Sequence, residues 1–114
     1  MFKVQPLACA LGAELSGVDL TTELLPEVLS ELRRLLVEYE VLFLRDQDVS
    51  PAQHRALAAS FGPLQTHPAY ATVDGFPEIT ILESTAENPS KIEAWHSDMT
   101  FREHPPLGAV LRSK

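Results

Sequence analysis

The stretch from Leu24 to Tyr39 constrains the fold of this chain more than any other feature. Its apolar residues recur at three- and four-residue spacing, the period of an α-helix with one buried face; they are Val28, Leu32, Leu35, Leu36 and Tyr39. Pro26 stands where the first turn of a helix tolerates proline. The stretch predicts a helix over residues 24–39 whose apolar face needs a partner surface.

A short strand and a second helix are expected next. Residues 40–45 form a short apolar run followed by polar residues, which suits a buried strand. Ser50 is suited to cap a helix that begins with Pro51, and Gln53 occupies the position of a capping-box residue. We expect the second helix to run from about residue 51 to residue 61, with three residues facing inward: Leu57, Ala58 and Phe61.

The rest of the chain is rich in candidate strands. Alternating or apolar residues predict extended segments that cover residues 2–7, 11–18, 78–83, 95–101 and 107–111. Residues 65–75 are irregular and predict a loop. The pattern predicts a mainly β chain with packed helices (α+β), either helices on an antiparallel sheet or a partial barrel, without a second domain.

Charge and composition narrow the kinds of partner. Nine Lys and Arg against sixteen Asp and Glu give a formal net charge of −7, which argues against binding nucleic acid or an anionic membrane and favours a small molecule. No apolar run approaches the roughly 20 residues that span a bilayer, and the start does not resemble a signal peptide, so a cytoplasmic location is expected. The lone Cys9 is expected to be a small buried hydrophobe near a strand.

His96 and Asp98 form the sharpest chemical motif. Two residues apart on a strand, they would point to one face with Cα atoms about 7 Å apart. An imidazole nitrogen and a carboxylate oxygen, completed by a second His, make the facial triad of non-haem Fe(II) oxygenases. By itself a His-x-Asp motif is weak evidence for a metal, because such a motif is more often a surface hydrogen-bonded pair.

The other histidines have less informative surroundings. His67 lies in the irregular segment with Tyr70 three residues on, and an imidazole with a phenol can bind an anionic substrate group, although loop packing is the alternative. His54 is expected to face solvent from the second helix. His104 is expected to be an exposed loop residue.

Several segments, in order, resemble the taurine dioxygenase family of Fe(II)- and 2-oxoglutarate-dependent oxygenases. They cover residues 12–20, 41–47, 55–62, 67–70 and 95–101, followed by Pro105-Pro106. The resemblance implies a double-stranded β-helix (jelly roll) of which residues 1–114 form the N-terminal part of one catalytic domain. It also implies that His96 and Asp98 are the first two iron ligands. The family's third ligand, a His, and its 2-oxoglutarate-binding Arg and Thr would lie beyond residue 114.

The resemblance further implies a substrate site. His67 would contact the sulfonate end of the substrate, Tyr70 would lie in the same pocket, and Met99 would line it beside the metal. Ile92 stands where taurine-specific members carry an amide side chain. Because an aliphatic group cannot donate that hydrogen bond, a related sulfonate or a more apolar acid becomes an alternative to taurine.

The resemblance implies the function of a dioxygenase that hydroxylates taurine or a related sulfonate at the carbon beside the sulfonate group. The products would be sulfite, an aldehyde, succinate and CO₂. The alternatives are a family member that acts on another organic acid or a sulfate ester, and a truncated, non-catalytic binding module. Fe(II), 2-oxoglutarate, O₂ and an anionic substrate are the expected partners, and the full-length protein is expected to be a homo-oligomer. The apolar run at residues 107–111 leads us to expect a truncated chain that associates through an unpaired strand edge.

Overall fold

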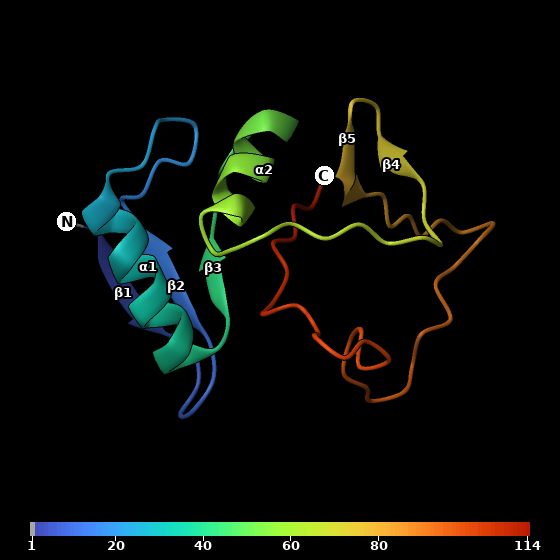
Figure 1. Cartoon of the computed structure of the whole chain (residues 1–114). Coiled ribbons are helices and arrows are strands. Elements are labelled where there is room, and N and C mark those ends of the chain that lie inside the picture. Colours follow the sequence, from blue (N-terminus) through green and yellow to red (C-terminus); the bar gives the residue numbers. More distant parts are fainter. Residues whose placement is uncertain (1) are drawn as a thin grey trace.

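A computed structural model of the chain describes residues 2–114 (Figure 1). Met1, which the expected domain includes, lies outside the described residues. The chain forms two helices and two small sheets, followed by a long segment without helix or strand from residue 81 to residue 114. The α+β class is therefore confirmed, while a mainly β content is wrong, because the helices of 14 and 9 residues hold more residues than all the strands together.

A three-stranded sheet with strand order β1-β2-β3 begins the fold. β1 (Lys3–Pro6) pairs antiparallel with β2 (Ala13–Ser16), and β2 pairs parallel with β3 (Leu42–Leu44). A parallel pair needs a long crossover connection, and the helix between β2 and β3 provides it. The expected antiparallel sheet is thus corrected to a mixed one.

Helix α1 (Pro26–Tyr39) forms the core with this sheet (Figure 1). Leu32 and Leu35 are 2% and 1% exposed, and they meet Leu15 of β2, which is 3% exposed. The predicted apolar face is therefore confirmed. The helix ends at Tyr39 and is capped by Glu40, which has a left-handed φ of 63° and donates its backbone N–H to the Leu36 carbonyl.

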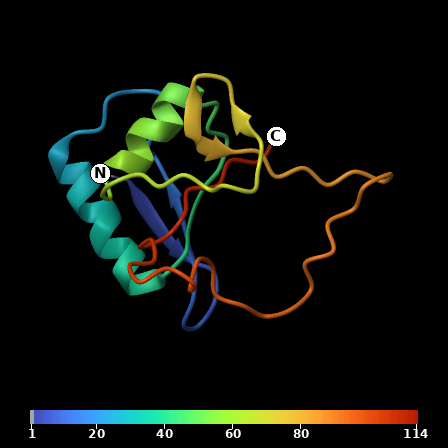
Figure 2. The same cartoon turned by 45° about the vertical axis from the view of Figure 1, so that its right-hand side comes forward.

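Helix α2 (Pro51–Ala59) lies beside both the core and the second sheet (Figures 1 and 2). Its predicted capping box is confirmed: the Ser50 hydroxyl accepts from the Gln53 N–H at 3.2 Å, and the Ser50 N–H donates to Gln53 Oε1 at 2.7 Å. Leu57 and Phe61 pack against the core as expected, although the helix ends two residues earlier than predicted.

The second sheet is a hairpin of β4 (Thr72–Val73) and β5 (Phe76–Thr80). Asp74-Gly75 forms its turn, where Gly75 adopts a φ of 77° that a glycine tolerates. The strand predicted at residues 78–83 is therefore shifted towards the N-terminus, and the expected loop at 65–75 contains β4 and the turn. An ion pair of 3.1 Å between Arg55 and Glu78 ties the hairpin to α2.

Residues 81–114 follow an open path around the hairpin, and Figure 2 shows part of it extending away from the helices. The radius of gyration is 15.2 Å, against about 13 Å for a compact domain of this length. The strands predicted at residues 95–101 and 107–111 are wrong. A strand requires a partner for its backbone groups, and no strand among residues 2–114 pairs with either segment.

Two smaller findings complete the fold. Cys9 is exposed in the bend between β1 and β2, so its predicted burial is wrong: a connection between two antiparallel strands runs over the surface. Within the described part of the chain, neither helix combines the length and apolar character needed to cross a membrane.

Candidate metal centre

The side chains of His96 and Asp98 meet, although the residues lie in a turn region and not on a strand. His96 Nε2 and Asp98 Oδ1 are 2.9 Å apart, with side chains 53% and 78% exposed. A turn follows Asp98 directly: the Arg102 N–H donates to the Met99 carbonyl at 3.1 Å, and Met99 has a left-handed φ of 58°. One nitrogen and one oxygen donor therefore converge on a common point.

A backbone carbonyl determines which nitrogen of His96 faces Asp98. His96 Nδ1 lies 2.8 Å from the Ala94 carbonyl oxygen, which can only accept, so Nδ1 carries a hydrogen. This hydrogen bond is the main cause of the raised pKa of His96, followed by the negative charge of Asp98. The 2.9 Å contact is therefore that of the protonated imidazole, in which Nε2 also carries a hydrogen and donates it to Asp98 Oδ1. When that hydrogen is lost, the Nε2 lone pair is free for a cation, as in metal sites where a carbonyl orients a histidine ligand.

This donor set fits a divalent cation such as Fe(II). A cation at this point would take the place of the Nε2 proton and would be held by one imidazole nitrogen and one carboxylate oxygen. Among residues 2–114, no group of three or more His, Cys, Asp or Glu side chains is arranged to hold a metal. The pair thus supplies two ligands of a possible three.

His67 and Tyr70 also lie together, in the connection between α2 and β4. Their ring centroids are 4.7 Å apart with the planes tilted by 49°. The Ala69 N–H donates to His67 Nδ1 at 3.1 Å, so Nδ1 is an acceptor and the hydrogen of a neutral imidazole is on Nε2. His67 is half-buried and Tyr70 is 44% exposed, which leaves an N–H and a phenol available to an anion.

The two apolar candidates occupy different surroundings. Ile92 is 68% exposed and lines an open pocket of about 310 Å³ together with four consecutive residues: Glu93, Ala94, Trp95 and His96. Met99 is half-buried in the turn that follows Asp98. Ile92 therefore shares a pocket with the candidate ligand His96.

The remaining histidines divide into one confirmed and one wrong prediction. His104 is exposed, as predicted. His54 does not simply face solvent, because it is half-buried and its Nε2 lies 2.7 Å from the carbonyl oxygen of Val110. Sequence reasoning missed this contact because the two residues are 56 positions apart.

Arg102 is a further residue that sequence reasoning missed. Its guanidinium donates to Gln65 Oε1 and to the Thr66 carbonyl, both at 3.1 Å. These residues directly precede His67. Within residues 2–114, no hydrogen bond or ion pair joins His67 or Tyr70 directly to His96 or Asp98. The connection between the two segments that carry them is made by Arg102.

Two curated proteins and one solved structure are similar to this chain. An alkylsulfatase from Acinetobacter baylyi and an alpha-ketoglutarate-dependent sulfate ester dioxygenase from Pseudomonas putida are each 31% identical to this chain over 96% of its length. The crystal structure of a taurine dioxygenase from Burkholderia xenovorans is similar to this chain with a TM-score of 0.62 and 43% sequence identity. The superposition covers 67% of this chain and 28% of the taurine dioxygenase.

The chain spans about a third of the length of the curated relatives that it matches, 34% of the alkylsulfatase and 36% of the sulfate ester dioxygenase. Residues 3–114 match the family described as taurine catabolism dioxygenase TauD, TfdA family. The resemblance noted in the sequence is thereby confirmed over nearly the whole chain. With relatives and a solved structure that are dioxygenases of the same kind, this chain belongs to the TauD, TfdA family of alpha-ketoglutarate-dependent dioxygenases.

Proposed function

We propose that this chain is part of an Fe(II)- and 2-oxoglutarate-dependent dioxygenase that hydroxylates the carbon beside the sulfur-containing group of a small anionic substrate. The observation that carries the proposal is the 2.9 Å approach of His96 Nε2 to Asp98 Oδ1, with His96 Nδ1 held by the Ala94 carbonyl. His96 and Asp98 are the metal ligands. A third ligand and the residues that bind 2-oxoglutarate come from outside this chain, which spans about a third of its relatives.

Fe(II) held by His96 and Asp98 would, with 2-oxoglutarate and O₂, supply the oxidant: one oxygen atom of O₂ would enter succinate as CO₂ leaves, and the other would be inserted into the substrate C–H bond. The resulting hydroxylated carbon then expels the sulfur group, as sulfite from a sulfonate or as hydrogensulfate from a sulfate ester, and becomes an aldehyde. The protein's part is to hold the substrate carbon near the metal and to keep water away.

His67 and Tyr70 bind the anionic end of the substrate. The Ala69 N–H occupies His67 Nδ1, so the hydrogen on Nε2 is the donor that the imidazole offers to a sulfonate or sulfate oxygen. The phenol of Tyr70, 4.7 Å away by ring centroids, supplies a second donor. Because neither residue touches the candidate metal ligands, substrate binding and metal binding are separate tasks.

The alternative to taurine is an alkyl sulfate ester, and two observations favour it. Ile92 gives the open pocket beside His96 an aliphatic wall, and Ile92 can neither accept a hydrogen bond from an ammonium group nor donate one to a sulfonate. Two of the curated relatives are named for alkyl sulfates and sulfate esters. We therefore propose an organosulfur anion as the substrate, with an alkyl sulfate preferred over taurine.

A product assay on the full-length protein that contains this chain tests the proposal. With Fe(II), 2-oxoglutarate and O₂, we expect succinate and hydrogensulfate from hexyl sulfate, and less succinate and sulfite from taurine. A sulfite signal that exceeds the hydrogensulfate signal would reverse the substrate order. If neither compound yields an aldehyde and succinate formation does not respond to Fe(II), the chain is a non-catalytic binding module instead.

A further inference from the structure

We propose that Arg102 is a positioning residue, which holds the substrate-binding segment, residues 65–70, at a defined place relative to the metal-binding turn, residues 96–102. The inference rests on the proposed function for the roles of the two segments. The bridge between the two segments is formed by hydrogen bonds of Arg102, and its existence does not depend on the proposed function.

The bridge begins in the metal-binding turn. The backbone N–H of Arg102 donates to the Met99 carbonyl at 3.1 Å, which closes the turn that follows Asp98. The base of the Arg102 side chain is therefore fixed relative to Asp98 by one short hydrogen-bonded loop. A displacement of Arg102 requires that this turn open or move as a unit.

The bridge ends beside His67. The planar guanidinium offers Nη1 to Gln65 Oε1 and Nη2 to the Thr66 carbonyl, each at 3.1 Å. Two bonds from one rigid fork fix the orientation of the acceptor segment as well as its distance. Thr66 directly precedes His67, so a shift of the bridge is transmitted to the imidazole.

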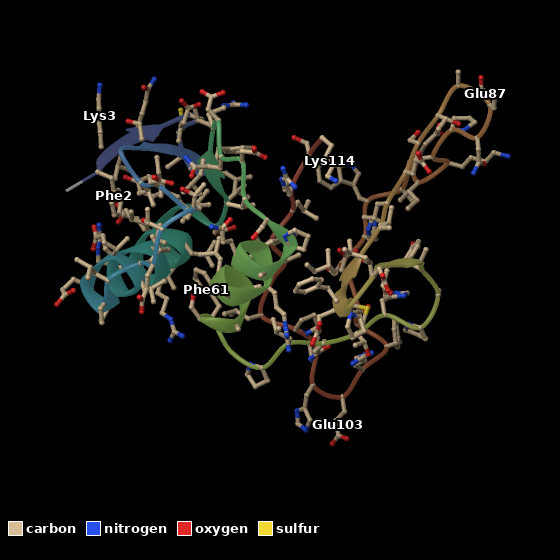
Figure 3. All side chains as sticks on the ribbon, turned by 90° about the horizontal axis from the view of Figure 1, so that it is seen from above. Phe2, Lys3, Phe61, Glu87, Glu103 and Lys114 are labelled. Atoms are coloured by element: carbon tan, nitrogen blue, oxygen red, sulfur yellow. The ribbon has the colours of Figure 1, made fainter. Side chains whose placement is uncertain are left out.

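Other links between the segments are weak. Residues 81–98 are all exposed and contain neither helix nor strand, so the covalent path through them does not fix the metal-binding turn. Within residues 2–114, the hydrogen bonds and ion pairs that join residues 95–104 to segments outside the adjoining chain are those of Arg102. Figure 3 shows the consequence: the turn that carries Glu103 lies beside the chain that follows α2, while Glu87 lies at the tip of a loop far from it.

The Arg102 guanidinium forms hydrogen bonds in this bridge but no ion pair. Arg34, Arg45, Arg55 and Arg112 each pair with a carboxylate. Among residues 2–114, no carboxylate lies within ion-pair distance of Arg102, which instead binds two neutral oxygen acceptors. A substitution at Arg102 therefore removes the bridge without leaving a carboxylate unpaired.

Three variants of the full-length protein, and a double variant built on one of them, test the role. Arg102→Met removes both bonds, and Arg102→Lys keeps the charge but loses the fork. Arg112→Met is the matched control, because Arg112 is also a partly buried arginine of the irregular half, at 26% side-chain exposure, and it binds Asp48 instead of the substrate segment.

The first measurement is millisecond hydrogen–deuterium exchange, which does not depend on activity. Arg102→Met should speed exchange at residues 65–70 and 96–102, while Arg112→Met leaves both segments unchanged. Unchanged exchange in Arg102→Met would overturn the proposal. Equal acceleration along the whole chain in both variants would also overturn it, since that result indicates a general loss of stability.

The second measurement separates positioning from metal binding. In Mn(II)-loaded protein with 2-oxoglutarate, Arg102→Met should weaken the binding of hexyl sulfate about tenfold, the size expected when charge-assisted hydrogen bonds are lost, with Mn(II) affinity unchanged. Adding Gln65→Glu to Arg102→Lys should recover part of the affinity, because a Lys–Glu ion pair then replaces the fork. An equal loss of Mn(II) affinity, or no recovery, would contradict the positioning role. If hexyl sulfate and taurine both fail to bind the unmodified protein, the proposed substrate has failed, and the exchange measurement still decides the role of Arg102.

Discussion

Replacement of Asp98 by alanine should abolish tight metal binding without unfolding the protein. The Asp98 side chain is 78% exposed and contacts His96, so the metal-free protein loses only an exposed ion pair, an interaction that contributes little to stability. Metal affinity should fall more than about 100-fold. The reason is that loss of a residue that only supports a metal ligand already lowers metal affinity about 10- to 100-fold.

The effect can be measured as metal-induced stabilisation of the full-length protein. At a Mn(II) concentration of 100 times the dissociation constant, binding stabilises the native state by about 2.7 kcal/mol. If the dissociation constant rises 100-fold, the same Mn(II) concentration equals the new dissociation constant. The stabilisation of the native state by Mn(II) then falls to about 0.4 kcal/mol. Most of the rise in melting temperature on adding Mn(II) should therefore disappear in Asp98→Ala.

Glu103→Ala is the matched control, since it removes an exposed carboxylate from the same part of the chain. It should keep the full metal-induced shift. Our reasoning would be refuted if Asp98→Ala retained that shift, because the carboxylate would then not be a ligand. It would also be refuted if Asp98→Ala melted far below the unmodified protein without metal, because the pair would then be structural.

Three further predictions concern the substrate site and the fold. His67→Ala should raise the KM for the organosulfur substrate about tenfold while leaving substrate-free succinate formation unchanged; an equal loss of both would contradict its role. Leu35→Ala should lower the free energy of unfolding by about 2–5 kcal/mol in urea titrations, because Leu35 is 1% exposed in the core; a loss below that range would show that the site can collapse. Ser50→Ala should cost about 1 kcal/mol and Ser50→Thr less, as expected for the cap of α2; equal losses would argue against the hydroxyl as the cause.

The elements that could be predicted from the sequence are those determined by neighbours in the chain. The periodic leucines of α1, the apolar run of β3 and the capping box of α2 act within a few residues of each other. The hairpin was only partly predicted, although Asp74-Gly75 is a strong turn signal. The strand predicted around His96 was wrong because pairing depends on a partner elsewhere, which local alternation cannot supply.

The candidate site shows the same limit. The two-residue spacing of His96 and Asp98 predicted that both side chains could reach one point, and they do, although the turn replaces the expected strand. Arg102 and His54 could not be assigned from the sequence. Their hydrogen-bond partners are 36 to 56 positions away in the sequence. The residues around an arginine or a histidine do not indicate which distant oxygen it will bind.

The core and the candidate site lie in different halves of the chain, and this division bears on how the site works. The buried cluster and the apolar residues packed on it all come from residues 2–61, whereas the candidate ligands and substrate-binding residues come from residues 67–99. The second half is attached to the first by polar contacts such as Arg55 with Glu78, His54 with Val110 and Arg112 with Asp48. In each of these contacts one partner is half-buried: the Glu78 side chain is 18% exposed, the Arg112 side chain is 26% exposed, and His54 is partly buried. Residues 81–98, which include both candidate ligands, are all exposed and form neither helix nor strand. Part of the binding energy of the metal must therefore be used to order this segment, and the measured metal affinity will be weaker than the contacts alone would give.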